Sequence, residues 1–433
     1  GTVPASLEEK SLAELLDDLR AFLEIRCHRW TNASLADAAT MLSYGMLKRL
    51  LNREYPDKDH SALHNTLLKG LPNLVSNLPV TRLWDLSREI RGDVRLTEIF
   101  ADNDATQILN QLQQTECDAF REQLDDYLDQ FGFRCSGELM LTVPSFQENP
   151  AALVEILQAY SHLESDSPID RLMQQDAQRS IETKRVLREL KRRKLWRFLP
   201  WPGTAFLTKR LLKWTQSSIA LRERARLKQA LLYTRCRRIV LAIGSHLVST
   251  GDMDDCQDIF FLTHQEIEDL LSGTSMFPGQ VRELINQRKT AHVRLSQMTP
   301  PDTFELPAGT HWSCETDNEQ ISQAEAQAEG GGTPTQENVT EWNGVGACGG
   351  TATGPAAILK DVSEFHLLTA GDILVTRQTD PGWGPMFFLI KGLVIERGGM
   401  LSHGAILARE YGIPTVVGVQ DATRQITHGQ TLT

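Results

Sequence analysis

The residues with the clearest chemical potential lie in one short segment, where Gly398, Gly399 and Gly404 flank Ser402 and His403. Glycines favour a tight turn and let another molecule approach the backbone. Ser402 is a good N-cap for the helical pattern that follows it, which places His403 in the first helical turn. The helix dipole there keeps an imidazole neutral and nucleophilic near pH 7, and free N–H groups can hold phosphoryl oxygens. This pattern predicts a phosphohistidine carrier, with Ser402 and the glycines supporting the phosphate.

A histidine at a helix start can also be a plain capping or packing residue, and the surrounding elements decide between the two interpretations. A β-like run, Met386–Ile395, precedes the glycine turn. The residues from Gly412 to Gly418 are typical of a helix C-cap followed by a buried strand. The pattern therefore predicts strand, glycine turn, helix and strand, with the histidine at the turn.

Residues 398–418 resemble the mobile phosphohistidine domain of phosphoenolpyruvate-utilising enzymes. Two further segments agree with that family in the same order, one over residues 349–356 and one over residues 371–383. The resemblance implies a small α/β domain at residues 342–433. Such a domain swivels between separated sites and would carry the phosphoryl group on His403.

Three residues near the histidine are candidate supports for the imidazole ring or for the docked domain. Thr379 lies in the upstream loop of the family pattern, and Arg409 and Glu410 follow His403 by about two helical turns. Packing or simple solvent exposure is the alternative for Arg409 and Glu410. Because the chain stops at Thr433 inside a strand-like pattern, we expect this domain to be truncated at its C-terminus.

The composition indicates a globular protein and argues against several classes of partner. Hydrophobic residues make up 41% of the 433 residues and charged residues 23%. The net charge of −11 disfavours binding to nucleic acid, and no apolar run approaches the length of a membrane span. Seven scattered cysteines without CxxC spacing are typical of reduced thiols. We expect a cytoplasmic protein with no metal site and no nucleic-acid or membrane partner.

The chain divides into three parts by pattern. Residues 1–312 show apolar residues at helical spacing over most of their length, with a strand-like break at about 131–150. Residues 313–341 are acidic, lack Lys and Arg and contain three consecutive glycines, which favours a flexible acidic linker; a disordered loop without a mechanical role is the alternative. The predicted fold is multidomain, a mostly α-helical substrate-binding domain followed by the small α/β swivelling phosphohistidine domain.

The helical part carries a second resemblance. Residues 131–150, with later landmarks at 221–223 and 258–263, are similar to the substrate domain of rifampicin phosphotransferase-like proteins. By this resemblance, Arg134 and Glu138 would position a substrate hydroxyl and its incoming phosphate. An internal ion pair at a turn is the alternative for these two residues.

Aromatic and basic residues in the second half of the helical part have two interpretations each. Trp196, Trp201 and Phe206 would line an apolar substrate pocket or its lid, or pack as core at a corner between helices. The basic stretch at residues 184–238 consists of solvated helix faces, or it is a docking face for the phosphorylated domain.

The order of domains implies the activity of the whole enzyme. Rifampicin phosphotransferases have an ATP-grasp domain, a helical substrate domain and then the histidine domain, and no glycine-rich phosphate loop occurs in residues 1–300. We therefore expect ATP and Mg²⁺ on an upstream ATP-grasp domain outside this chain, and no cofactor bound by this part alone. His403 would relay the β-phosphoryl group of ATP to a hydroxyl of a small, lipophilic substrate such as a rifamycin-like antibiotic, with release of AMP and phosphate.

Other functions use the same histidine domain. One is a phosphoenolpyruvate synthase or pyruvate phosphate dikinase-like enzyme, which needs a barrel after Thr433. Another is an ATP-driven condensing enzyme of natural-product synthesis. A sensor module that retains the fold without turnover is the non-enzymatic alternative, and the intact Ser402–His403 pair argues against it.

Overall fold

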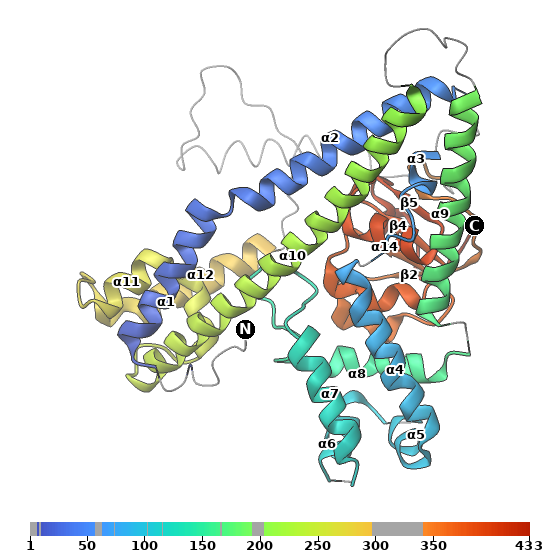
Figure 1. Cartoon of the computed structure of the whole chain (residues 1–433). Coiled ribbons are helices and arrows are strands. Elements are labelled where there is room, and N and C mark those ends of the chain that lie inside the picture. The colour runs from blue at the N-terminus through green and yellow to red at the C-terminus, as the bar shows by residue number, and fades with distance from the viewer. Residues whose placement is uncertain are drawn as a thin grey trace.

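The computed structural model describes residues 7, 10–56, 63–72, 74–101, 103–114, 116–164, 167–192, 203–296 and 341–433. The described part up to residue 296 is helical, and residues 345–432 form a six-stranded sheet with short helices (Figure 1). The predicted fold class, a mostly helical part followed by a small α/β domain, is confirmed.

Two long helices form the frame of the helical part. α2 (Thr31–Glu54) packs along α10 (Thr204–Ser249), which runs for 46 residues without a proline (Figure 1). α3 (Leu63–Thr66) and α9 (Pro168–Arg192) complete their shared apolar core. This packing fixes the middle of α10 beside the α/β domain.

A distal cluster covers the C-terminal half of α10. The helices involved are α1 (Leu12–Glu24), α11 (His264–Leu271) and α12 (Val281–Ser296), with η4 (Cys256–Phe261). Ser11 caps α1, and it forms a reciprocal capping box with Glu14. The short element η1 (Ile25–Arg29) connects α1 to α2, and η5 (Pro278–Gln280) lies between α11 and α12.

A second group of helices lies against the α/β domain. Its members are η3 (Val75–Asn77), α4 (Leu78–Gly92), α5 (Val94–Ala101), α6 (Ala105–Gln114), α7 (Asp118–Phe131) and α8 (Ala151–His162). Between α7 and α8, the predicted strand-like break at 131–150 is wrong, because this stretch consists of turns. Two backbone hydrogen bonds, Phe146 N–H to Arg134 O and Gln147 N–H to Gly132 O, hold the loop together without a strand ladder. Leu139 has a φ of 75° within it.

The sheet has the order β1-β5-β4-β3-β2-β6, with the four central strands parallel and both edge strands antiparallel. The strands are β1 (Val345–Cys348), β2 (Gly354–Ile358), β3 (Ile373–Thr376), β4 (Gly392–Ile395), β5 (Thr415–Val417) and β6 (Thr431–Leu432). The helical segments between them are η6 (Val362–Leu367), η7 (Pro381–Phe388), α14 (His403–Tyr411) and α15 (Ala422–Gln425).

The predicted β-like run at Met386–Ile395 is only partly a strand. Its first residues belong to η7, a 3₁₀ segment that begins at Pro381, and only Gly392–Ile395 forms β4. Apolar residues dominate the run because η7 is buried between the sheet and the helical part, so periodicity alone could not separate strand from buried turn.

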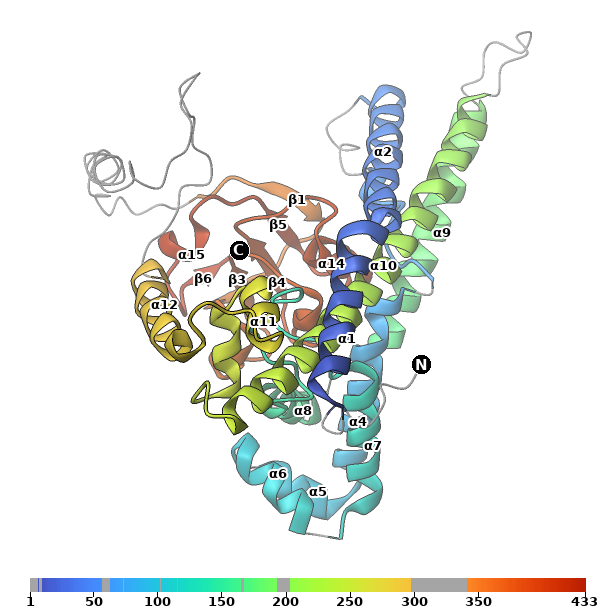
Figure 2. The same cartoon turned by 90° about the vertical axis from the view of Figure 1, so that its left-hand side faces the viewer.

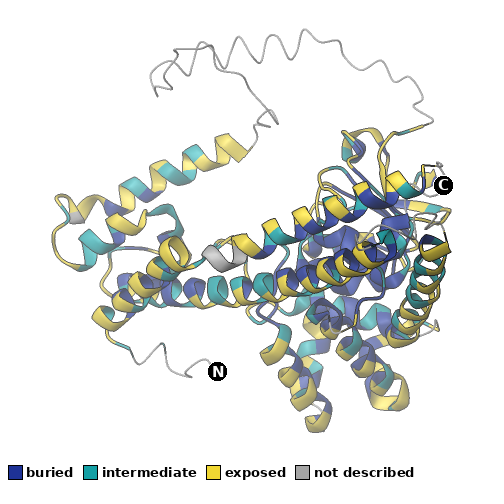
Figure 3. Cartoon of the chain, turned by 45° about the horizontal axis from the view of Figure 1, so that its top comes forward, coloured by how far each residue is buried: buried dark blue, intermediate teal, exposed yellow. Residues whose placement is uncertain are grey.

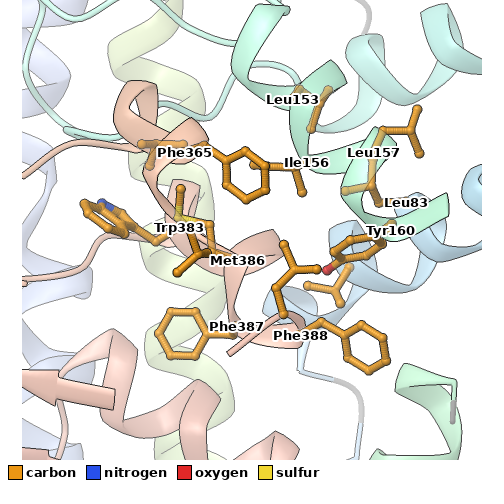
Figure 4. Packing of buried hydrophobic residues seen from close by; sticks show 14 of the residues in the cluster. Leu83, Leu153, Ile156, Leu157, Tyr160, Phe365, Trp383, Met386, Phe387 and Phe388 are labelled. Carbon is orange, nitrogen blue, oxygen red and sulfur yellow. The ribbon is translucent and has the colours of Figure 1, made fainter. Parts of the chain in front are cut away.

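One apolar cluster runs from the helical part into the α/β domain. In Figure 4, Leu83 of α4 and Tyr160 of α8 lie close to Phe388 of η7. The Phe388 ring centroid is 5.1 Å from that of Trp84 and 5.6 Å from that of Tyr160. Figure 3 shows buried residues concentrated in the sheet and in the helix faces around it. The α/β domain is therefore docked on the helical part through a desolvated surface.

Candidate active site

α14 places the predicted histidine at the docked surface. Ser402 is its N-cap and accepts a hydrogen bond from Ala405 N–H at 3.4 Å. Gly412 ends the helix in the left-handed conformation, with a φ of 68°. The predicted helix and both its caps are confirmed, and His403 occupies the first helical position, where it is 3% exposed.

The glycine after the histidine allows a close approach from the upstream loop. A Cβ at Gly404 would lie 2.3 Å from Thr379 Oγ1, so only glycine fits here without a shift. Thr379 is buried, and its hydroxyl has no hydrogen-bond partner among the described residues. Of the two turn glycines, Gly398 lies against Ser402 and Gly399 faces open space.

Glu223, in the middle of α10, is a residue of the helical part that contacts His403. Its carboxylate lies 3.3 Å from His403 Nδ1, an ion-pair distance without hydrogen-bond alignment, and both side chains are 2% exposed. Ser76 Oγ donates a 2.6 Å hydrogen bond to the same carboxylate. Burial alone would raise the pKa of Glu223, but the contacts with His403 and Ser76 outweigh it and hold that pKa below its usual value. Glu223 is therefore ionised and its charge faces Nδ1.

Arg134 and Glu138 form an ion pair of 2.7 Å, and both side chains are nearly fully buried. The alternative of an ion pair at a turn is what the structure contains, but the pair also lies near the histidine. Burial raises the pKa of Glu138 while the charges of Arg134 and His403 lower it, and the neighbouring Asp380 raises it further. Asp380 follows Thr379 and is likewise raised in pKa by burial, against the charges of His403 and Arg226. The site thus combines one imidazole with three carboxyl groups and two arginines.

The two other predicted supports, Arg409 and Glu410, are both buried, and among the described residues their hydrogen bonds go to groups other than the imidazole. Arg409 donates to Met400 O at 2.8 Å and so braces the glycine turn. Glu410 accepts a 2.9 Å hydrogen bond from Leu71 N–H of the helical part. Their positions favour support of the turn and of the docked interface over contact with the ring.

Of the three aromatic candidates, Phe206 lies within the described residues. Phe206 is half exposed at the start of α10, with the Arg210 guanidinium over its ring. Trp196 and Trp201 lie outside the described residues, as does the predicted linker at 313–341 except for its last residue.

The basic stretch at 184–238 is not simply a set of solvated faces. Arg222 and Arg237 are buried, and they pair with Asp37 and Glu148 at 2.7 and 2.8 Å. These two arginines stabilise the helical part itself.

Some site residues were not predicted from the sequence. Glu223 lies within a family landmark and Arg226 within the basic stretch that is a possible docking face, but neither is predicted to meet the histidine, and Asp380 has no predicted role. For Glu223 the available signal is an acidic residue within a strongly basic stretch. Among the described residues, no group of three or more His, Cys, Asp or Glu side chains is arranged to hold a metal ion. None of the described helices is long and apolar enough to span a bilayer.

Two protein families match the two parts of the chain. Residues 32–223 match the family described as the rifampicin phosphotransferase fourth domain. Residues 368–433 match the PEP-utilising enzyme mobile domain. The chain therefore belongs to the PEP-utilising phosphotransferases, and its helical part is of the rifampicin phosphotransferase type.

Individual relatives agree with this classification. Rifampicin phosphotransferase of Streptomyces sviceus is 31% identical over 374 residues, covering 84% of this chain and 39% of the relative. Rifampicin phosphotransferase of Bacillus cereus is 29% identical over 312 residues, covering 72% of this chain and 33% of the relative. Phosphoenolpyruvate synthase of Escherichia coli is 45% identical over 80 residues, which cover 18% of this chain and 10% of that enzyme. This chain thus spans well under half the length of the relatives it matches.

Proposed function

We propose that the protein is a phosphotransferase in which His403 carries a phosphoryl group from ATP to a hydroxyl of a small substrate held by the helical part. The observation that carries the proposal is the buried contact between His403 of the α/β domain and Glu223 of the helical part. A phosphohistidine must contact the domain that holds the acceptor before it can transfer its phosphoryl group. ATP and Mg²⁺ would bind an ATP-grasp domain that residues 1–433 do not include, as the family resemblance implies.

Glu223 gives the imidazole a defined protonation state for transfer. Its ionised carboxylate faces Nδ1, which favours a proton on that nitrogen and leaves Nε2 to carry the phosphoryl group. In the transfer step the P–Nε2 bond breaks and its electron pair returns to Nε2, while a P–O bond forms to the acceptor oxygen. Because Nδ1 keeps its proton, the leaving group is neutral imidazole.

The acceptor hydroxyl must lose its proton in the same step. Glu138 lies near His403, and its pKa is raised, chiefly by burial, which suits a general base close to neutral pH. Arg134, paired with Glu138 at 2.7 Å, would orient the carboxylate and stabilise charge on the incoming phosphate.

The acceptor class follows from the helical part. Its match to the rifampicin phosphotransferase fourth domain favours a lipophilic, hydroxylated molecule such as a rifamycin-like antibiotic. A phosphoenolpyruvate-forming reaction has less support, because the similarity to phosphoenolpyruvate synthase covers only 18% of the chain.

The relay is tested by incubating the full-length protein with ATP labelled at the β-phosphorus. We expect acid-labile label on the protein, its loss in His403→Ala, and AMP release that accelerates when a hydroxylated acceptor is added. Label that persists in His403→Ala would exclude His403 as the carrier. His366→Ala is a suitable control because it removes an exposed histidine of the same domain.

A further inference from the structure

Several buried polar atoms at the docked surface have no hydrogen-bond partner among the described residues. They include the donors Arg134 Nε, Arg226 Nε and Thr379 Oγ1, together with the imidazole nitrogen His403 Nε2. A buried donor without an acceptor costs about 1–3 kcal/mol, so a group of them indicates a missing anionic or polar ligand.

These donors belong to one place in the fold. Arg226 is half-buried and follows Glu223, which contacts His403, by one turn on the same side of α10. Thr379 Oγ1 lies against Gly404, next to the histidine, because a Cβ at Gly404 would lie 2.3 Å from it. The charges of both His403 and Arg226 act on the Asp380 carboxyl, so both lie near it.

When His403 carries a phosphoryl group, the negative charge of the site requires a positively charged side chain nearby. A phosphoryl group on His403 brings nearly two negative charges into a site that already holds the carboxyl groups of Glu223, Glu138 and Asp380. Arg134 already pairs with Glu138 at 2.7 Å. Arg226 Nε has no hydrogen-bond partner among the described residues, and the guanidinium can give several N–H donors to phosphoryl oxygens.

We propose that Arg226 is the phosphoryl-binding residue of the docked state, and that its guanidinium with Thr379 Oγ1 and the first turn of α14 forms an oxyanion site around the loaded histidine. This inference rests on the proposed function, since it assigns a ligand to the same site. Arg226 belongs to the helical part and His403 to the α/β domain, so the site is complete only when the two are docked. Loading of the histidine therefore strengthens docking, and discharge weakens it.

Binding of inorganic phosphate to the unphosphorylated chain tests the site without ATP or acceptor. Isothermal titration at fixed ionic strength should give binding that Arg226→Gln weakens at least about tenfold. Arg226→Lys should retain most of it, because the charge remains. The matched control is Arg224→Gln, which removes the same charge from an exposed position on the same helix.

Equal phosphate affinity in wild type and Arg226→Gln, or an equal loss in Arg224→Gln, would overturn the inference. A second measurement follows single-turnover kinetics of the full-length protein, in which Arg226→Gln should load His403 at the normal rate but discharge to the acceptor at least about tenfold more slowly. Normal discharge would also overturn it. Failure of His403 to load even in wild type would refute the proposed function instead, and the phosphate titration would still decide on Arg226.

Discussion

Glu410 is a buried acidic residue of the docked surface and is 1% exposed. It accepts a hydrogen bond from Leu71 N–H across the interface and another from the side chain of Asn77. Burial raises its pKa to about 8, against the opposing effects of these hydrogen bonds and of the nearby charges of Arg409 and Arg179. The carboxyl is therefore protonated near neutral pH, although a free glutamate would be ionised.

This shift predicts a pH dependence of stability. Because the pKa is raised in the folded, docked state, the contribution of Glu410 is fully present below about pH 4.5 and is lost progressively as pH rises to about 8. Glu410→Gln mimics the neutral carboxyl at every pH. The free energy of unfolding of the variant, relative to that of wild type, should therefore rise by up to about 1.4 kcal/mol per pH unit in this window. Thermal unfolding of both proteins at several pH values measures the difference. A constant difference from pH 5 to pH 8 would show that Glu410 does not hold a proton.

Residues that act locally were predictable from the sequence, and residues that act across the interface were not. Ser402, His403 and Gly412 are spaced by the rules of a single helix, and those rules hold wherever the helix lies. Glu223 contacts the histidine, and Arg226 lies one turn further along α10, only because α10 passes beside α14. No local sequence pattern encodes that contact. For the same reason, the Arg134–Glu138 pair could be read equally well as a substrate contact or an internal ion pair.

At the scale of elements, the position of α14 depends on the absence of a Cβ atom at Gly404. A methyl group at Gly404 would clash with Thr379 Oγ1 at 2.3 Å and with Ile395 Cδ1 at 2.8 Å. Both neighbours are buried between the sheet and α14, so they have little room to move. The first turn of α14, and His403 with it, would have to shift away from the loop.

Gly404→Ala should therefore destabilise the protein by about 1–3 kcal/mol, in line with overpacking of a close-packed core. The expected result is a lower midpoint in chemical denaturation with an unchanged slope. Gly399→Ala, five residues earlier in the same turn region, has no atom within 4 Å of its new methyl group and should behave like wild type. Equal stability of the two variants would mean that the Thr379 contact does not set the position of α14.

Not every element was predictable from its pattern. The helix from His403 was, because its caps and periodicity agree. The buried 3₁₀ segment η7 was taken for a strand, since a short apolar run has no period that distinguishes the two. The loop at 131–150 was given strand-like pieces, yet its backbone bonds are too few for a ladder and Leu139 adopts a positive φ.

At the scale of the whole molecule, the α/β domain is docked through contacts that a single methyl group would disturb. A Cβ at Gly382 would lie 2.0 Å from Cys135 O and 2.5 Å from Cys135 C, which are backbone atoms of the helical part. The first residue after it, Trp383, donates a 3.4 Å hydrogen bond from Nε1 to Ser136 O of the same loop. The clash therefore falls between the two parts, and the α/β domain itself would not be affected.

Gly382→Ala should separate the α/β domain from the helical part while both stay folded. We expect faster hydrogen exchange in η7 and in the facing α8, with unchanged exchange in the central strands of the sheet. Gly384→Ala is the matched control, because its methyl group meets only Leu407 Cδ1 at an ordinary 3.7 Å. Protection of η7 equal to that of wild type would mean that the loop at Cys135 yields and that docking does not depend on this approach.

Trp383 also gives the docked state an optical signature. Its indole is 2% exposed, and its surroundings come from both parts of the molecule. Separation of the two parts would place this ring in water, and a solvated indole emits at longer wavelength and is open to collisional quenchers. A phenylalanine replacement at this position, compared with the unaltered protein, isolates its contribution from the other seven tryptophans in the sequence. Separation of the α/β domain from the helical part can thus be followed in real time without an added dye.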